Sequence, residues 1–248
     1  MDGAPASKPA FQVHAGQALA VTAPPRQYVS RGGHKLAHGL DTFGVEPAGR
    51  HALDAGVSTG GFTDCLLQRG VASVVAVDVG YGQVHDRIRS DARVTVMERT
   101  NIRALTPADL PGPPIDLVVC DLSFIALQTV LPTLRELASA DEAEAVVLVK
   151  PQFEAGRDQV GKGGVVRDPE VWRAVLSDII VAAAQAWPVV GLTASPLRGP
   201  AGNVEFLAHL VPMNAGPHPD AAALVEAAVA EGREVRGGQA RESPGTQQ

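Results

Sequence analysis

The sequence predicts an α/β fold in which helices cover both faces of a mainly parallel sheet. Short runs of Val, Leu, Ile and Ala alternate with segments of helical periodicity, as in successive strand and helix units. Several runs are apolar throughout, which is typical of strands buried on both faces. The first complete unit, residues 51–68, contains an apolar run, an acidic residue, a glycine-rich turn and an amphipathic segment.

Composition favours one domain with short ends. The chain has 248 residues, of which 45% are hydrophobic and 19% charged, enough for one core. Its two cysteines, Cys65 and Cys120, lie far apart in apolar elements, so neither a disulfide nor a thiolate metal site is expected. No apolar stretch approaches the roughly 20 residues that span a bilayer, and no signal peptide is evident. We therefore expect a cytoplasmic protein.

The charge distribution permits RNA binding without requiring it. The net charge of −6 argues against a wholly basic surface. Residues 1–40, however, carry Lys8, Arg26, Arg31 and Lys35 against Asp2 alone, so the start of the chain is locally basic.

The elements follow in order along the chain. Leu36, Leu40 and Phe43 share one face of a helix that Gly44 ends, with Lys35 in its first turn. After the opening unit we expect strands at 74–77, 93–97, 115–120, 145–149, 189–195 and 204–210, and helices at 127–137, 169–187 and 219–231. Residues 151–168 are glycine-rich and predict a lid or binding loop in which Arg157, Lys162 and Arg167 could face phosphates, and residues 232–248 predict a disordered polar tail.

The glycine turn lacks the residues that bind phosphate groups, which indicates a ligand that is not held through phosphates. Phe62 stands where a phosphate-binding loop needs lysine, and Ser58 where a dinucleotide fold needs its middle glycine. An acidic strand end and flexible glycines remain. The turn's candidate cofactor-binding residues are Asp54, Gly56, Ser58, Thr59, Gly60, Gly61 and Phe62.

Polar residues close three further strands. Asp78 ends the second strand, where an acidic side chain can accept hydrogen bonds from ribose hydroxyls. Asn101 follows the third strand and could bind an adenine edge, although asparagine in a turn commonly caps its own backbone. Asp121 follows the fourth. Together with the turn, these residues favour S-adenosylmethionine as the cofactor.

Four residues could supply a reaction at the same edge of the sheet. Asp121 and Lys150 end the fourth and fifth strands, Lys35 lies in the first helix, and Glu205 starts the final strand. A lysine at the carboxyl end of a central strand is notable, because ligands of parallel sheets bind at that edge.

The motifs YVSRGGHKL, LDAGVSTGGFTDCLL, VDVGYGQ, ERTNIR, DLSFI, LVKPQFEAGR, VGKGGVVRDP and GNVEF occur in this order within residues 28–209. In this set the chain resembles the TlyA (haemolysin A-like) rRNA methyltransferases and, more broadly, the FtsJ/RrmJ-type ribose 2'-O-methyltransferases. The resemblance implies a class I S-adenosylmethionine-dependent methyltransferase fold, Rossmann-like, with seven mostly parallel strands, one of them antiparallel. It also implies the catalytic tetrad Lys35, Asp121, Lys150 and Glu205, and a cytidine 2'-hydroxyl of ribosomal RNA or ribosomal subunits as the target. The methyl transfer needs no metal, and none is expected.

Two roles stay open for Lys150, which we expect to activate the hydroxyl. A neutral Lys150 would act as the base, whereas cationic lysines would make the hydroxyl more acidic while Asp121 and Glu205 orient them. Alternative functions are a non-catalytic RNA-binding or ribosome assembly factor and, less favoured, a haemolysin-type activity.

Three segments are expected along the chain. Residues 1–27 resemble the closing strands of a truncated S4-like RNA-binding domain with its linker. Residues 28–214 form the methyltransferase domain, and residues 215–248 a C-terminal helix and tail.

Overall fold

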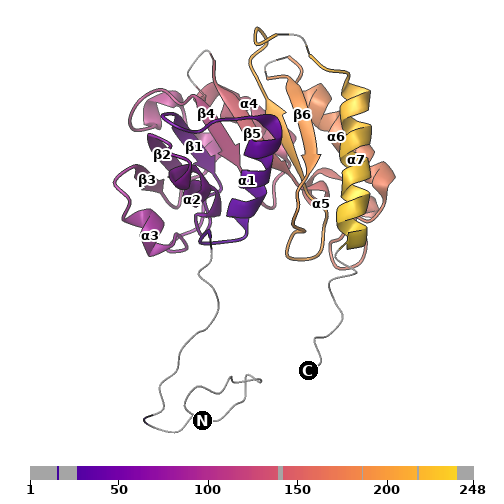
Figure 1. The fold of residues 1–248 in the computed structure, drawn as a ribbon, viewed down its shortest axis with the longest axis horizontal. Coiled ribbons are helices and arrows are strands. Elements are labelled where there is room, and N and C mark those ends of the chain that lie inside the picture. Colours follow the sequence, from indigo (N-terminus) through magenta and orange to yellow (C-terminus); the bar gives the residue numbers. More distant parts are fainter. Residues whose placement is uncertain (1–15, 17–26, 139–141, 186, 217, 239–248) are drawn as a thin grey trace.

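The computed structural model describes residue 16 and residues 27–138, 142–185, 187–216 and 218–238. Seven strands form one sheet in the order β3-β2-β1-β4-β5-β7-β6 (Figure 1). All neighbours pair in parallel except β7, which runs antiparallel to β5 and β6. This confirms the expected mostly parallel sheet with one antiparallel strand. The strands are β1 (His51–Ala55), β2 (Ser73–Val77), β3 (Val94–Met97), β4 (Leu117–Cys120), β5 (Glu144–Val149), β6 (Val189–Ala194) and β7 (Phe206–Leu210).

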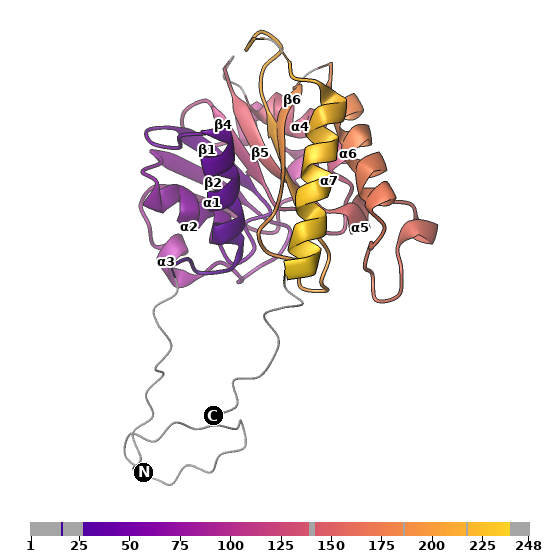
Figure 2. The ribbon, with the colours of Figure 1, turned by 45° about the vertical axis from the view of Figure 1, so that its right-hand side comes forward.

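Helices cover both faces of the sheet, as Figures 1 and 2 show. One face packs against α1 (Gly32–Phe43), α2 (Gly61–Gln68) and α3 (Asp86–Arg89), and the other against α4 (Leu127–Leu137), α6 (Pro169–Ala183) and α7 (Ala221–Gly238). Strand side chains alternate between the two cores: Ala52 faces the first set of helices, and Leu53 the second. This double burial explains why the strands are apolar throughout.

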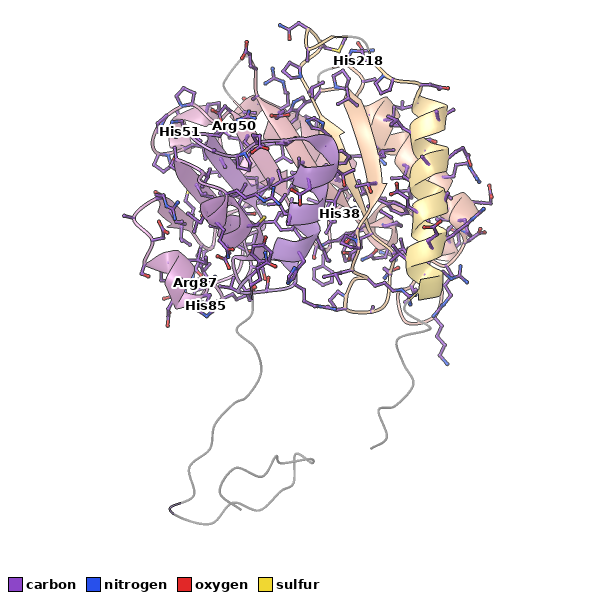
Figure 3. All side chains as sticks on the ribbon, viewed as in Figure 1. His38, Arg50, His51, His85, Arg87 and His218 are labelled. Carbon is purple, nitrogen blue, oxygen red and sulfur yellow. The ribbon has the colours of Figure 1, made fainter. Side chains whose placement is uncertain are left out.

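The strand order places a crevice between β1 and β4. The chain leaves β1 toward α2 on one face and leaves β4 toward α4 on the other. At such a switch point the loops after the two strands diverge, and ligands bind outside their carboxyl ends. In Figure 3 these ends lie at the lower edge, because Arg50 and His51, where β1 begins, are at the upper edge.

Several strands begin or end one or two residues from the expected bounds, and three expectations differ from the structure by more. Helix α6 ends at Ala183 rather than 187. Residues 151–168 are not a simple loop, since they contain α5 (Pro151–Glu154), a 3-10 turn (Arg157–Gln159) and a bridge between Gly161 and Val165. The C-terminal helix α7 continues to Gly238, so residues 232–238 are not a disordered tail.

Packing explains the length of α7. Gly232 is buried, and a Cβ there would lie 3.1 Å from the Phe206 ring. A residue that looks like a helix breaker therefore allows the helix to approach the sheet closely. The expected S4-like remnant lies outside the described residues, apart from residues 16 and 27, as does the tail from residue 239.

Candidate active site

The glycine turn after β1 is held close to the loop after β4. Gly56 has φ +92°, and a Cβ there would lie 2.7 Å from the carbonyl oxygen of Asp121. The backbone N–H groups of Gly56 and Val57 both donate to the carbonyl of Val77, at 2.8 and 3.1 Å. Only glycine fits the first position, because a side chain would push the two loops of the crevice apart.

The next two glycines bring α2 against its neighbours. Gly60 has φ +96°, and a Cβ there would lie 2.8 Å from Ile88. At Gly61 a Cβ would lie 2.2 Å from Ser30 Oγ, just before α1. The small residues of the turn thus serve close packing as well as access for a ligand.

Asp54 lies beneath the turn rather than in a cavity. It is fully buried, and its Oδ2 accepts a hydrogen bond of 2.6 Å from Thr63 Oγ. Its Oδ1 has no hydrogen-bond partner among the described residues. Burial raises the pKa of this carboxyl to about 7, the Thr63 hydroxyl lowers it, and the charges of Asp121 and Asp78 raise it further. Through this hydrogen bond Asp54 joins the end of β1 to the first turn of α2, on either side of the glycine turn.

Asp78 fixes the turn from the side. Its Oδ2 accepts from the backbone N–H of Ser58 at 2.8 Å, and its Oδ1 from that of Gly80 at 2.7 Å. It lines a cavity of about 320 Å³. The other residues lining this cavity are Gly56, Ser58, Val77, Val79, Gly80, Gln83, Thr100, Ile102, Asp121, Leu122, Ser123 and Phe124.

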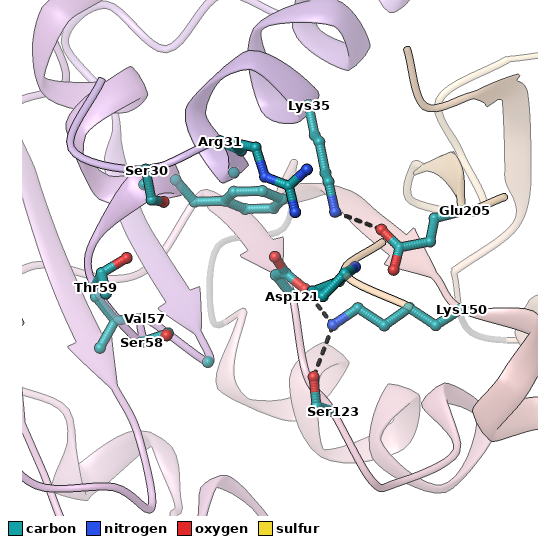
Figure 4. Close-up of a pocket in the computed structure, with 15 residues that line it drawn as sticks. Ser30, Arg31, Lys35, Val57, Ser58, Thr59, Asp121, Ser123, Lys150 and Glu205 are labelled. Atoms are coloured by element: carbon teal, nitrogen blue, oxygen red, sulfur yellow. Dashed lines mark hydrogen bonds and ion pairs between the residues drawn. The ribbon is translucent and has the colours of Figure 1, made fainter. Parts of the chain in front are cut away.

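A second cavity of about 280 Å³ adjoins the first and shares Gly56, Ser58, Asp121 and Ser123 with it (Figure 4). It contains all four residues that the sequence suggested for catalysis. Its lining residues are Ser30, Arg31, Gly32, Lys35, Gly56, Val57, Ser58, Thr59, Gly61, Phe62, Asp121, Ser123, Lys150, Pro200 and Glu205.

The four residues form two ion pairs across this cavity. Lys35 pairs with Glu205, and Lys150 Nζ lies 2.5 Å from Asp121 Oδ1 (Figure 4). Lys35, Lys150 and Glu205 are buried, with residue exposures of 6%, 8% and 1%. Each buried lysine amine thus has a carboxylate beside it, the partner that a buried charged group needs.

Topology explains why these residues meet. Asp121 follows β4 and Lys150 follows β5, so both lie at the carboxyl edge of the sheet. Glu205 precedes β7, and because β7 is antiparallel its start lies at the same edge. The expectation that Glu205 begins the strand was off by one residue, since β7 starts at Phe206.

Ser123 is a site residue that the sequence reasoning missed. Lys150 Nζ donates to Ser123 Oγ at 2.9 Å, and Ser123 lines both cavities. The next residue, Phe124, has φ +66° and is 91% exposed, with its ring 5.3 Å from that of Phe153. The only signal in the sequence was the position of Ser123, two residues after a polar strand end.

Asn101 is not brought to either cavity. Its side-chain oxygen accepts from the backbone N–H of Arg103 at 3.1 Å and caps a 3-10 turn (Ile102–Ala104), while its neighbours Thr100 and Ile102 line the first cavity. In the structure Asn101 therefore caps the backbone of its own turn, the alternative to binding an adenine edge. Gly60 and Asp54 also lie outside both linings.

The described residues contain neither a cluster of metal ligands nor a helix that could span a membrane. There, no three His, Cys, Asp or Glu side chains are grouped so that they could hold a metal ion. In the same part of the chain, no helix is both long and apolar enough to cross a membrane.

Comparison with known proteins identifies similar sequences and folds. The model of the family described as FtsJ-like methyltransferase matches residues 28–211. The 16S/23S rRNA (cytidine-2'-O)-methyltransferase TlyA of Mycobacterium tuberculosis is 56% identical over 208 residues, covering 83% of this chain and 77% of that protein.

Solved structures agree with the sequence match. A hemolysin-type protein from Streptococcus thermophilus is 38% identical, with a TM-score of 0.82 over 90% of this chain and 80% of its own. A Listeria monocytogenes S-adenosylmethionine-dependent methyltransferase, 12% identical, has a TM-score of 0.54 over 75% of this chain and 100% of its own, which supports the fold alone.

Proposed function

The chain belongs to the FtsJ-like methyltransferases, and from this premise we propose that it transfers a methyl group from S-adenosylmethionine to a ribose 2'-hydroxyl of ribosomal RNA, that of a cytidine. The observation that carries the proposal is the pair of buried lysine–carboxylate contacts in one cavity, Lys35 with Glu205 and Lys150 with Asp121, beside a glycine turn. The named relative acts on cytidine, which supports the choice of nucleotide.

The two adjoining cavities suit two different ligands. The cavity containing Asp78 offers a carboxylate for ribose hydroxyls and an apolar wall from Ile102 and Leu122, which fits an adenosine. The turn carries no cationic side chain, which fits a cofactor without phosphates. The cavity containing Lys150 would receive the target ribose. Their shared wall, with Gly56, Asp121 and Ser123, is where methyl donor and acceptor would meet.

The bound cofactor supplies an electrophilic methyl group on a positively charged sulfur. Transfer of this methyl to the 2'-oxygen would leave the sulfur neutral with the electron pair of the broken carbon–sulfur bond, and would require the hydroxyl to give up its proton. The protein must therefore position the oxygen and promote loss of that proton.

Lys150 is the group assigned to the hydroxyl. Its Nζ lies 2.5 Å from Asp121 Oδ1 and donates to Ser123 Oγ, and Lys150 lines the cavity. A neutral amine would offer the hydroxyl a lone pair, and an ammonium would offer it an N–H. A base role gives a rate that rises with pH as the amine loses its proton, whereas a cationic role gives a rate that falls.

The test uses methyl-labelled S-adenosylmethionine with ribosomal subunits that lack the modification. Label should enter rRNA, and nuclease digestion followed by mass spectrometry should recover 2'-O-methylcytidine. Label on a base, or label on no RNA while calorimetry shows cofactor binding, would refute the proposed reaction. Absence of cofactor binding would favour the non-catalytic RNA-binding alternative.

A further inference from the structure

Five basic residues that the proposed chemistry does not use lie on two loops and at one helix end near the catalytic cavity. Arg157, Lys162 and Arg167 lie in the segment 156–168, Arg198 in the β6–β7 connection, and Arg236 near the end of α7. We call this set the arginine surface. It adjoins the cavity because Pro200 and Glu205, from the same connection as Arg198, line the cavity wall.

The two loops are fixed to each other by one buried side chain. Asn203, 2% exposed, accepts a hydrogen bond from the backbone N–H of Val166 at 2.9 Å and donates to the carbonyl of Gly164 at 2.8 Å. The segment 156–168 is therefore held against the β6–β7 connection. The segments that carry Lys162, Arg167 and Arg198 are therefore packed against each other.

The arginines are also linked directly. Arg236 Nη1 donates to the carbonyl of Arg167 at 2.5 Å, and Arg198 Nη2 donates to the carbonyls of Val235, at 3.1 Å, and Arg236. The Arg167 side chain also lies near the residue before Lys162: a Cβ added at Gly161 would be 3.5 Å from Arg167 Nη1.

These contacts pair the arginines with backbone carbonyls rather than with carboxylates. Within the described residues, none of the five side chains forms an ion pair with a carboxylate. Arg173, on the neighbouring helix α6, pairs with both Glu170 and Glu226. Backbone carbonyls satisfy guanidinium hydrogen bonds but carry no net charge, so gathering these cations has an electrostatic cost that a bound anion would remove.

We propose that the arginine surface binds the phosphodiester backbone of the RNA next to the methylated nucleotide, an inference that rests on the proposed function. A ribose in the cavity is joined to neighbouring phosphates, and the β6–β7 connection that carries Arg198 also lines the cavity through Pro200 and Glu205. Guanidinium groups suit phosphate oxygens because their planar N–H pairs match them in geometry and charge. The surface would hold the strand while the cavity selects the ribose.

The test compares Arg236→Gln and Lys162→Gln with the control Arg173→Gln. All three remove one positive charge, and Arg236 and Lys162 are exposed, so their replacement leaves the core intact. Filter binding of unmodified 16S and 23S rRNA transcripts is measured from 50 to 200 mM salt. Each surface variant should weaken binding roughly tenfold and reduce the slope of log affinity against log salt by about 0.7 to 0.9. Cofactor affinity, and kcat at saturating RNA, should stay at wild-type values.

Three outcomes would overturn the proposal. The double variant Lys162→Gln and Arg236→Gln could bind the transcripts with unchanged affinity and salt slope. Arg173→Gln could weaken binding equally, which would indicate a general charge effect. Binding could also weaken for whole ribosomal subunits but not for naked transcripts, which would assign the surface to an acidic protein. Because binding is measured without methyl transfer, an inactive wild type whose surface variants bind RNA less well would refute the reaction and support the surface.

Discussion

Asp54 allows a quantitative test of the electrostatics beneath the glycine turn. It is fully buried, and burial, its largest influence, raises the carboxyl pKa from an ordinary 3.8 to about 7. The folded protein therefore keeps a proton on Asp54 that the unfolded chain has lost above pH 4. This contribution to stability is complete below the unfolded pKa and is lost as pH rises through the folded pKa.

The size of the effect follows from the shift. Each pKa unit corresponds to about 1.36 kcal/mol, so the whole shift is worth roughly 4 kcal/mol, of which roughly 3 kcal/mol is lost between pH 5 and pH 8. Replacing Asp54 with Asn removes the titration while keeping an oxygen for the hydroxyl of Thr63. Between pH 5 and pH 8 the free energy of unfolding should therefore fall less for Asp54→Asn than for the wild type, and the difference should equal the loss assigned to Asp54.

Urea unfolding at pH 5, 6, 7 and 8 measures the difference. Every other titrating group is common to both proteins, so subtracting the two curves isolates Asp54. Thr63→Val provides a second variant. It removes the hydroxyl whose hydrogen bond lowers the pKa of Asp54, so the decline in stability should extend to higher pH. Parallel curves for the wild type and Asp54→Asn would refute the reasoning.

Three further substitutions test the site. Lys150→Ala should reduce methyl transfer at least 100-fold, the lower end for loss of a proton-transfer group, while calorimetric cofactor affinity stays near the wild-type value. Gly56→Ala should lower stability by about 1 to 3 kcal/mol in urea unfolding and weaken cofactor binding, because its Cβ would lie 2.7 Å from the Asp121 carbonyl at φ +92°. Ser123→Ala should lower kcat roughly five- to tenfold through the lost hydrogen bond to Lys150, and Ser123→Thr should restore most of it.

Each has a control. Gly49 has φ +76°, and a Cβ there would have nothing within 4 Å, so Gly49→Ala measures backbone strain without a steric clash. Equal losses of stability in Gly49→Ala and Gly56→Ala would contradict the clash with the Asp121 carbonyl. Unchanged turnover in Lys150→Ala would remove that residue from the mechanism. If Ser123→Thr is as slow as Ser123→Ala, the hydroxyl is not the group that matters.

The parts of the fold that depend on local sequence were predictable. A strand buried on both faces must be apolar along its whole length, so the runs before Asp78, Asp121 and Lys150 located the strands and the polar residues at their ends. Parallel strands end at one edge, which is why Asp121 and Lys150 could be expected to lie together.

Other features depend on contacts that the sequence does not display. Gly232 looks like a helix end, and only its packing on Phe206 explains why α7 continues. The position of Ser123 against Lys150 depends on a loop whose next residue, Phe124, has a positive φ, which side-chain type does not predict. An asparagine such as Asn101 can cap a turn or bind a ligand, and here the backbone N–H of Arg103 is placed so that the side chain caps the turn.

The pairing of Lys35 with Glu205 also has a consequence for the order in which the centre is completed. The two residues are 170 positions apart, and Glu205 takes its place only when β7 inserts between β5 and β6. A chain synthesised only as far as residue 200 contains the glycine turn, Asp121 and Lys150, but leaves Lys35 without its carboxylate. Contacts between such distant residues form late, because a long loop must close first. During synthesis the reactive centre is therefore completed only after Glu205 and β7 have been made, later than the glycine turn.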